Sequence, residues 1–117
     1  MATYIDSTAL IASSAQLGAD ITVGPYCLIG DNVVIGNNVR LHSHVVIDGH
    51  TTIGAGCEIF PFAVLGARPQ PTRYNQEPSR LMIGKKCVIR EHVTMHPGTA
   101  IDAMETIVGN HGLNSRF

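Results

Sequence analysis

The sequence predicts an all-β fold, a parallel β-helix made of hexapeptide repeats and triangular in cross-section. Three observations lead to this class. A branched aliphatic residue recurs at every sixth position, glycine, asparagine and aspartate gather in the turns between, and charged residues make up only 15% of the chain. A period of six fits short strands with a turn after each, whereas apolar positions of an amphipathic helix recur at three, four and seven. All of residues 1–117 are expected to form this single domain.

The first part of the chain carries the repeat without interruption. The aliphatic residues in this register are Ile5, Ile11, Leu17, Val23, Ile29, Ile35, Leu41, Ile47, Ile53, Ile59 and Leu65. The residue four positions after each is usually small or β-branched, because both lie on one face of a strand with a period of two. Three strands per coil place residues 18 apart above one another. The expected inner ladders are Ile5/Val23/Leu41/Ile59, Ile11/Ile29/Ile47/Leu65 and Leu17/Ile35/Ile53.

The repeat breaks after Leu65. Residues 66–82 hold three prolines and three arginines, and since proline removes a ladder donor we expect them to form a loop ejected from the coil. The aliphatic register is expected to resume at Ile83, Ile89, Met95 and Ile101.

Two irregularities follow. The spacing from Ile101 to Val108 is off by one, which predicts a second short insertion near residues 102–106, and residues 114–117 continue the hexapeptide pattern poorly.

Composition excludes several function classes. Eight Lys and Arg against nine Asp and Glu give a net charge of −1, without the basic excess of a nucleic-acid binder. No apolar run approaches the ~20 residues of a membrane span. The first residues lack the basic and apolar regions of a signal peptide, and three cysteines do not suggest a disulfide framework. We therefore expect a cytoplasmic protein with neither a nucleic-acid partner nor a membrane span.

The ejected loop is a candidate binding site, because loops on a rigid scaffold often carry function. Its Gln70, Arg73, Glu77 and Arg80 could hydrogen-bond a polar or anionic ligand, and arginine suits phosphate. The alternative is a solvated insertion with a packing role, and the residues alone leave both interpretations open.

Six histidines and three cysteines are the other chemistry-bearing residues. Stacking of residues 18 apart places His44 between Tyr26 and Phe62. Histidines on one prism face could bind a metal, as in a His-based metallo-hydratase, or be ordinary strand residues; no metal-ligand motif supports the first interpretation. All three cysteines, Cys27, Cys57 and Cys87, occupy small inward positions, which favours buried apolar filler.

Four segments together resemble one enzyme family. They are residues 24–26 (Gly-Pro-Tyr), 43–51 (Ser-His-Val-Val-Ile-Asp-Gly-His-Thr), 76–80 (Gln-Glu-Pro-Ser-Arg) and 89–99 (Ile-Arg-Glu-His-Val-Thr-Met-His-Pro-Gly-Thr). The family is the acyl-[acyl-carrier-protein]–UDP-N-acetylglucosamine O-acyltransferases of lipid A biosynthesis, within the hexapeptide-repeat acyltransferases. The hexapeptide repeat is shared by many acyl- and acetyltransferases, so the combination of loop and histidine run is the more specific part.

The resemblance implies a left-handed β-helix in a homotrimer, with the site in the groove between subunits. It implies transfer of an (R)-3-hydroxyacyl group from acyl carrier protein to the 3-hydroxyl of UDP-N-acetylglucosamine, with the carrier thioester as co-substrate and no cofactor. By motif, Gln70 and Arg73 contact the nucleotide sugar, and His96 lines the same groove. The loop reads Gln-Pro-Thr-Arg-Tyr where the family has Gln-Asp-Leu-Lys-Tyr, so Arg73 stands for a lysine and Pro71 for an acidic residue.

The resemblance also implies where the general base lies. In the family it is a histidine of a His-x-x-His-Asp run, and that run falls beyond Phe117. We therefore expect a truncated family member without a catalytic residue of its own, inactive alone. The alternatives are a non-catalytic β-helix fragment that co-assembles with a longer homologue, and another hexapeptide-repeat acetyl- or acyltransferase.

Overall fold

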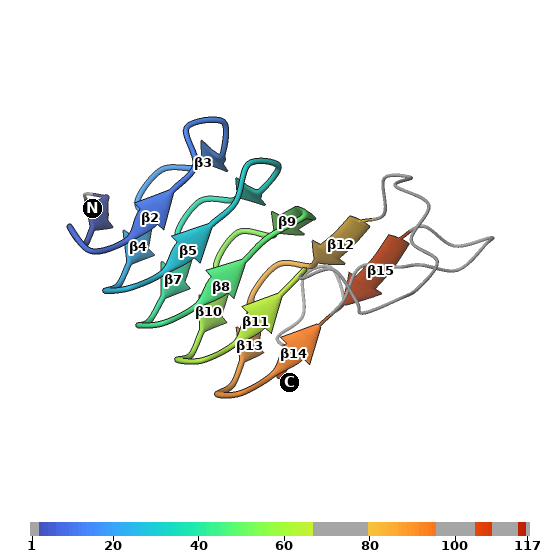
Figure 1. Ribbon diagram of the computed structural model, residues 1–117. Helices are drawn as coiled ribbons and strands as arrows, with labels where there is room; N and C mark the ends of the chain where they lie inside the picture. The colour runs from blue at the N-terminus through green and yellow to red at the C-terminus, as the bar shows by residue number, and fades with distance from the viewer. Residues whose placement is uncertain (1–2, 67–79, 96–104, 109–114, 117) are drawn as a thin grey trace, which may run out of the picture.

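The fold is a prism with three parallel β-sheets as its walls (Figure 1). The computed structural model describes residues 3–66, 80–95, 105–108 and 115–116. Successive strands pass from sheet A to sheet B to sheet C and back to A, so each coil adds one strand to every wall. None of the elements in these ranges is a helix of the length and hydropathy that a membrane span needs.

Most strands are only two residues long. Sheet A comprises β1 (Tyr4–Ile5), β4 (Thr22–Val23), β7 (Arg40–Leu41), β10 (Glu58–Ile59), β13 (Cys87–Ile89) and β16 (Ser115–Arg116). Sheet B comprises β2 (Leu10–Ile11), β5 (Leu28–Ile29), β8 (Val46–Ile47), β11 (Val64–Leu65) and β14 (Thr94–Met95). Sheet C comprises β3 (Gln16–Leu17), β6 (Val34–Ile35), β9 (His50–Ile53), β12 (Arg80–Ile83) and β15 (Glu105–Val108).

The core consists of the predicted inner ladders. Strand pairing puts Ile5, Val23, Leu41 and Ile59 in one register, and it confirms the other two ladders in the same way. From Val23 to Ile89 the inward side chains of the ladders are buried, because the coils above and below cover them, whereas Met95 is only partly buried. Ile5 in the first coil remains 40% exposed.

The structure corrects two expected boundaries. Strand β12 begins at Arg80, so the loop expected over residues 66–82 ends before that residue. Val108 lies in register with Ile83, where Ile101 was expected, and Ile101 itself lies outside the described residues; the additional residues of this coil therefore fall between Met95 and Glu105. Ser115 and Arg116 form β16 beside β13, but Cys87 and Ser115 are 28 residues apart where Ile83 and Val108 are 25 apart, so the regular spacing is broken here, as expected.

The three edges of the prism differ in their turn residues. At the edge between sheets C and A, positive φ angles occur at Asp20, Asn38, Gly56 and Lys86. At the edge between sheets A and B they occur at Tyr26, His44, Phe62 and His92. We call these the C/A edge and the A/B edge, and the third the B/C edge.

Candidate functional site

The B/C edge holds two connections that are longer than its regular turns, residues 67–79 and 96–104. Gly66 follows β11 and donates its backbone N–H to the carbonyl oxygen of Met95, the last residue of β14, at 2.7 Å. The segments 67–79 and 96–104 therefore start from paired strands of sheet B. They end at paired strands of sheet C, because Arg80 lies in register with Glu105. Two stretches far apart in sequence thus attach to the prism side by side.

Gly66, the last described residue before the first of these connections, is constrained by contacts with the preceding coil. Thr51 is fully buried and donates its hydroxyl to the carbonyl oxygen of Asp48 at 2.6 Å. Gly49 and Gly66 both have positive φ, and a Cβ on Gly66 would collide with the Thr51 hydroxyl and the Asp48 carbonyl. Only glycine allows this close approach, so no other residue fits at position 66 without a shift of the backbone.

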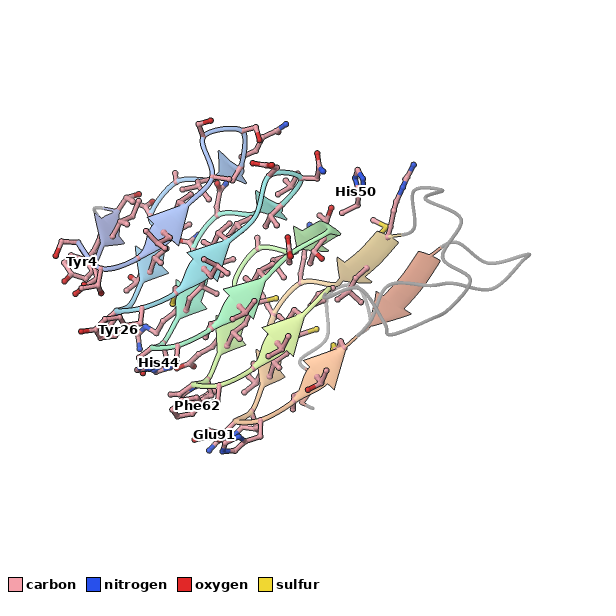
Figure 2. All side chains as sticks on the ribbon, viewed as in Figure 1. Tyr4, Tyr26, His44, His50, Phe62 and Glu91 are labelled. Atoms are coloured by element: carbon pink, nitrogen blue, oxygen red, sulfur yellow. The ribbon has the colours of Figure 1, made fainter. Side chains whose placement is uncertain are left out.

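The return of the first segment brings two basic side chains together. Arg80 opens β12 directly beside His50 at the start of β9, and both side chains are exposed. Figure 2 shows His50 projecting from the prism. The sequence indicated Arg80 as a candidate ligand contact, whereas His50 was only one of six histidines in it. His50 and Arg80 are separated by one 18-residue coil plus the inserted residues, and this spacing could have indicated that they are neighbours.

The predicted substrate contacts Gln70, Arg73 and His96 lie outside the described residues, as does Glu77. What the structure fixes is where their segments attach. His96 directly follows Met95, and Gln70 and Arg73 follow Gly66, whose amide bonds to Met95. The three predicted contacts therefore belong to segments that leave from neighbouring strands.

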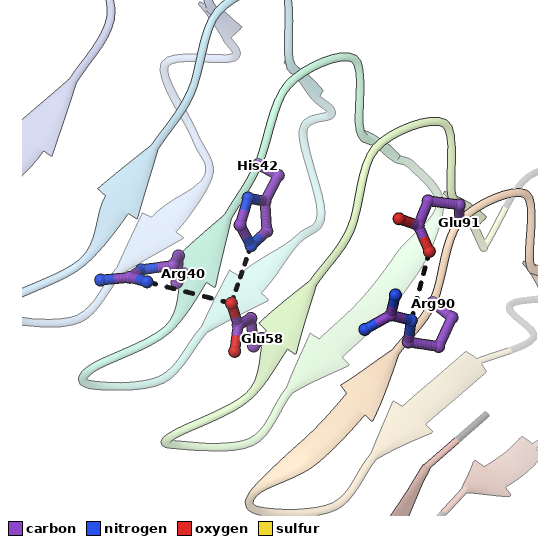
Figure 3. A network of polar contacts seen from close by, with 5 residues as sticks. All are labelled: Arg40, His42, Glu58, Arg90 and Glu91. Carbon is purple, nitrogen blue, oxygen red and sulfur yellow. Dashed lines mark hydrogen bonds and ion pairs between the residues drawn. The ribbon is translucent and has the colours of Figure 1, made fainter.

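A second group of polar side chains lies on the outer face of sheet A (Figure 3). His42 Nε2 is 2.8 Å from Glu58 Oε2, and Arg40 Nη1 is 3.9 Å from the same oxygen. Arg90 Nε pairs with Glu91 at 3.2 Å. The Phe60 ring stacks on the His42 ring at 4.5 Å and carries the Arg90 guanidinium 4.0 Å from its centre on the other side. These charges compensate one another, so the group is an ion-pair network rather than a free anion site.

The cysteines are buried, as predicted, and their thiols are free. Cys27 donates its thiol to the carbonyl oxygen of His42 at 2.9 Å, and Cys57 donates to that of Gly84 at 3.0 Å. Burial raises the pKa of the Cys57 thiol to about 11 and raises that of Cys27 as well. Protonated thiols are poor nucleophiles and poor ligands. Among the described side chains, no group of three or more His, Cys, Asp or Glu could hold a metal ion.

The predicted stacking of His44 is confirmed. Its ring centre lies 5.1 Å from that of Tyr26 and 5.1 Å from that of Phe62. His92 extends the row in the next coil at 5.4 Å from Phe62, a neighbour hidden in the sequence by the intervening loop.

Comparison with known proteins gives a consistent family signal. The model described as bacterial transferase hexapeptide (six repeats) matches residues 32–67. An acyl-[acyl-carrier-protein]–UDP-N-acetylglucosamine O-acyltransferase from Brucella ovis is 43% identical over 109 residues, which covers 93% of this chain and 39% of the relative. A protein of the same name from Mesorhizobium japonicum is 50% identical over 62 residues, covering 53% of this chain and 22% of the relative.

Solved structures agree with the sequence matches. A UDP-N-acetylglucosamine acyltransferase from Francisella novicida superposes with a TM-score of 0.86 at 39% identity, covering 96% of this chain and 41% of that one. One from Bacteroides fragilis gives 0.84 at 40% identity, covering 95% and 44%. These likenesses confirm both the predicted resemblance and the left-handed parallel β-helix of hexapeptide repeats. This chain spans less than half the length of each of these relatives.

Proposed function

We propose that this chain forms the part of an O-acyltransferase that binds the nucleotide sugar. The reaction moves an (R)-3-hydroxyacyl group from acyl carrier protein to the 3-hydroxyl of UDP-N-acetylglucosamine, the first step of lipid A biosynthesis. The observation that carries the proposal is the 43% identity to the Brucella ovis acyltransferase across 93% of this chain, including the stretches on both sides of the loop.

The B/C edge suits the binding of a nucleotide sugar. Gln70 and Arg73 belong to the first segment that leaves this edge, and His96 begins the second. Arg80 and His50 stand where the first segment rejoins sheet C. Arginine provides forked donors to a diphosphate, and the amide of glutamine can donate to and accept from sugar hydroxyls. These residues would bind and orient the acceptor.

The reaction requires a general base whose pKa lies near neutral pH. The sugar oxygen forms the new ester bond to the acyl carbon, the carbon–sulfur bond of the thioester breaks, and the hydroxyl proton passes to a general base. By resemblance that base is a histidine of a His-x-x-His-Asp run, and the residues of this chain prepare the acceptor for it.

Partner and location form part of the proposal. The chain assembles with further copies of itself into a homotrimer, and the donor is acyl carrier protein. Three free and buried cysteines fit a cytoplasmic protein.

A chimera tests the proposed reaction. Residues of this chain replace the matching 109-residue stretch of the Brucella ovis relative. The purified chimera receives acyl carrier protein loaded with a 3-hydroxyacyl chain, and mass spectrometry follows the acylated nucleotide sugar. We expect product from UDP-N-acetylglucosamine and little from UDP-glucose, which lacks the acetamido group.

Two further samples complete the test. The 117-residue chain alone is assayed beside the chimera. The unaltered relative shows that the donor is competent. A chimera that folds and assembles like the relative but forms no product would contradict the proposal.

A further inference from the structure

We propose that Cys57 and Cys87 form a redox-sensitive pair, which a low-molecular-weight disulfide converts into a disulfide bond between neighbouring coils of the core. Cys57 directly precedes β10, and Cys87 opens β13, the next strand of sheet A. In the sequence the two cysteines flank the connection 67–79. The inference concerns the core of this chain and is independent of the proposed acyl transfer.

Strand pairing places the two cysteines side by side. Glu58 lies in register with Val88, so the residues just before them, Cys57 and Cys87, occupy equivalent places in adjacent coils. Neighbouring strands of a sheet lie about 4.7–4.9 Å apart. This spacing falls within the range of about 4.4–6.8 Å that separates the Cα atoms of a disulfide. The backbone of the two coils is therefore already close enough for the bond.

Both side chains point into the core and contact each other. Cys57 is 1% exposed and Cys87 is fully buried. Cys57 donates its thiol to the carbonyl oxygen of Gly84 at 3.0 Å, which turns its sulfur towards the coil that contains Cys87. Burial raises the pKa of the Cys57 thiol to about 11, and a hydrogen bond between the two thiols adds to the increase. A bond between two sulfurs already in contact adds no volume to a close-packed core.

The third cysteine, Cys27, has no such neighbour. It precedes β5 in sheet B, and the residues beside it in register are Ala9 and Val45. Cys27 and Cys57 are nevertheless 30 residues apart, the same separation as between Cys57 and Cys87. Closing a loop of a given length costs an unfolded chain the same entropy wherever the loop lies. Only the fold therefore distinguishes the two pairs.

The oxidation balances with glutathione disulfide as the oxidant. The thiolate of one cysteine attacks a sulfur of the oxidant and releases one glutathione. The second cysteine attacks the resulting mixed disulfide, forms the protein disulfide and releases the other glutathione. Two electrons and two thiol protons thus pass from the protein to two glutathione thiols. Local opening of the coils admits the reagent, and the reaction accelerates with rising pH because the thiolate is the nucleophile.

Peptide mapping tests the pairing. The reduced chain is treated with glutathione disulfide at mildly alkaline pH, once folded and once in concentrated urea. Free thiols are then alkylated, and the linked peptides are quantified by mass spectrometry. In the folded chain we expect the Cys57–Cys87 link to exceed the Cys27–Cys57 link at least about tenfold, because only the first pair has disulfide geometry. In urea the two links should form in similar amounts.

Two results of the mapping would contradict the inference. Similar amounts of both links in the folded chain would mean that the register of β10 and β13 does not select the pair. A preference for the Cys57–Cys87 link that persists in urea would mean that the local sequence selects it.

Thermal unfolding of two single variants gives an independent measurement. Cys27→Ala keeps the proposed pair and Cys57→Ala removes it, and each variant loses one thiol that donates to a backbone carbonyl. We expect the oxidant to raise the unfolding midpoint of Cys27→Ala by at least about 5 °C, because the cross-link restricts the unfolded chain, and dithiothreitol to reverse the increase. The midpoint of Cys57→Ala should not move. An unchanged or lower midpoint for oxidised Cys27→Ala would overturn the inference.

Discussion

Single glycine residues set the directions in which this chain turns. Gly56 and Gly66 have nearly the same φ, +77° and +78°, yet they meet different surroundings. A Cβ on Gly56 would reach only Lys86 Cγ at 3.2 Å, the stem of a flexible side chain. A Cβ on Gly66 would strike a backbone carbonyl and a buried hydroxyl. Both positions therefore require a residue that accepts a positive φ, and only Gly66 also requires the absence of a Cβ.

Alanine at these two glycines separates backbone strain from steric collision. We expect Gly56→Ala to lower the free energy of unfolding by about 1–2 kcal/mol, the usual cost of a left-handed alanine. Gly66→Ala should lower it by at least about 3 kcal/mol, because the collision is added. Urea unfolding followed by circular dichroism measures both. Equal losses of unfolding free energy in the two variants would mean that the Thr51 hydroxyl and the Asp48 carbonyl do not restrict the residue at position 66.

The Cys57 thiol makes stability depend on alkaline pH. Its folded pKa is raised to about 11 by burial, against an ordinary value of 9.0. Between these values the unfolded chain loses the thiol proton and the folded chain keeps it, so stability falls as pH rises from 9 towards 11. We expect a loss of about 2 kcal/mol from this group. Cys57→Ala should unfold with a shallower pH slope above 9, and an unchanged slope would contradict this origin.

Strands of two residues are stable only because their neighbours stack on them. Ile59 is fully buried, with Leu41 and Ile89 on either side in its ladder. Ile5 starts the same ladder and is 40% exposed, with only Val23 beside it. The same side chain in the same register therefore contributes differently, because each coil is covered by its neighbours.

Truncation of these two isoleucines tests the ladder. Ile59→Ala should lower the free energy of unfolding by about 2–5 kcal/mol, since it leaves a cavity that two neighbouring rungs line. Ile5→Ala should cost less than about 1.5 kcal/mol, because part of the side chain already contacts solvent. Thermal and urea unfolding report both values. Similar losses at the two positions would argue against continuous stacking through Ile59.

The regular coils were predictable from sequence, and the irregular ones were not. A six-residue period determines which residue pairs with which as long as nothing interrupts it, so every ladder up to Leu65 is correct. After an insertion the period no longer determines which residues pair. Strand β12 begins at Arg80 because it pairs with β9, and Val108 lies beside Ile83 because β15 pairs with β12. No local sequence pattern reveals these pairings. The continuation of the ring row to His92 was hidden for the same reason.

The prism as a whole brings distant segments to one edge. Residues 67–79 and 96–104 are separated by β12, β13 and β14, yet both leave sheet B and return to sheet C at adjacent strands. The stacked coils thus place the ends of two long connections on neighbouring strands of one edge of the prism. The proposed contacts with the nucleotide sugar follow from this frame, since Arg73 lies in one segment and His96 in the other.

Ligand binding provides the test of that arrangement. In the chimera with the Brucella ovis relative, Arg73→Ala should raise the dissociation constant for UDP-N-acetylglucosamine about 10- to 100-fold in calorimetry, because a charged hydrogen bond to the ligand is lost. Arg40→Ala removes the same charge from the exposed face of sheet A, where Arg40 pairs with Glu58, and should leave binding unchanged. Equal weakening by both variants would indicate general charge attraction. Unaltered binding by Arg73→Ala would remove this residue from the proposed site, whichever surface the chain uses to assemble.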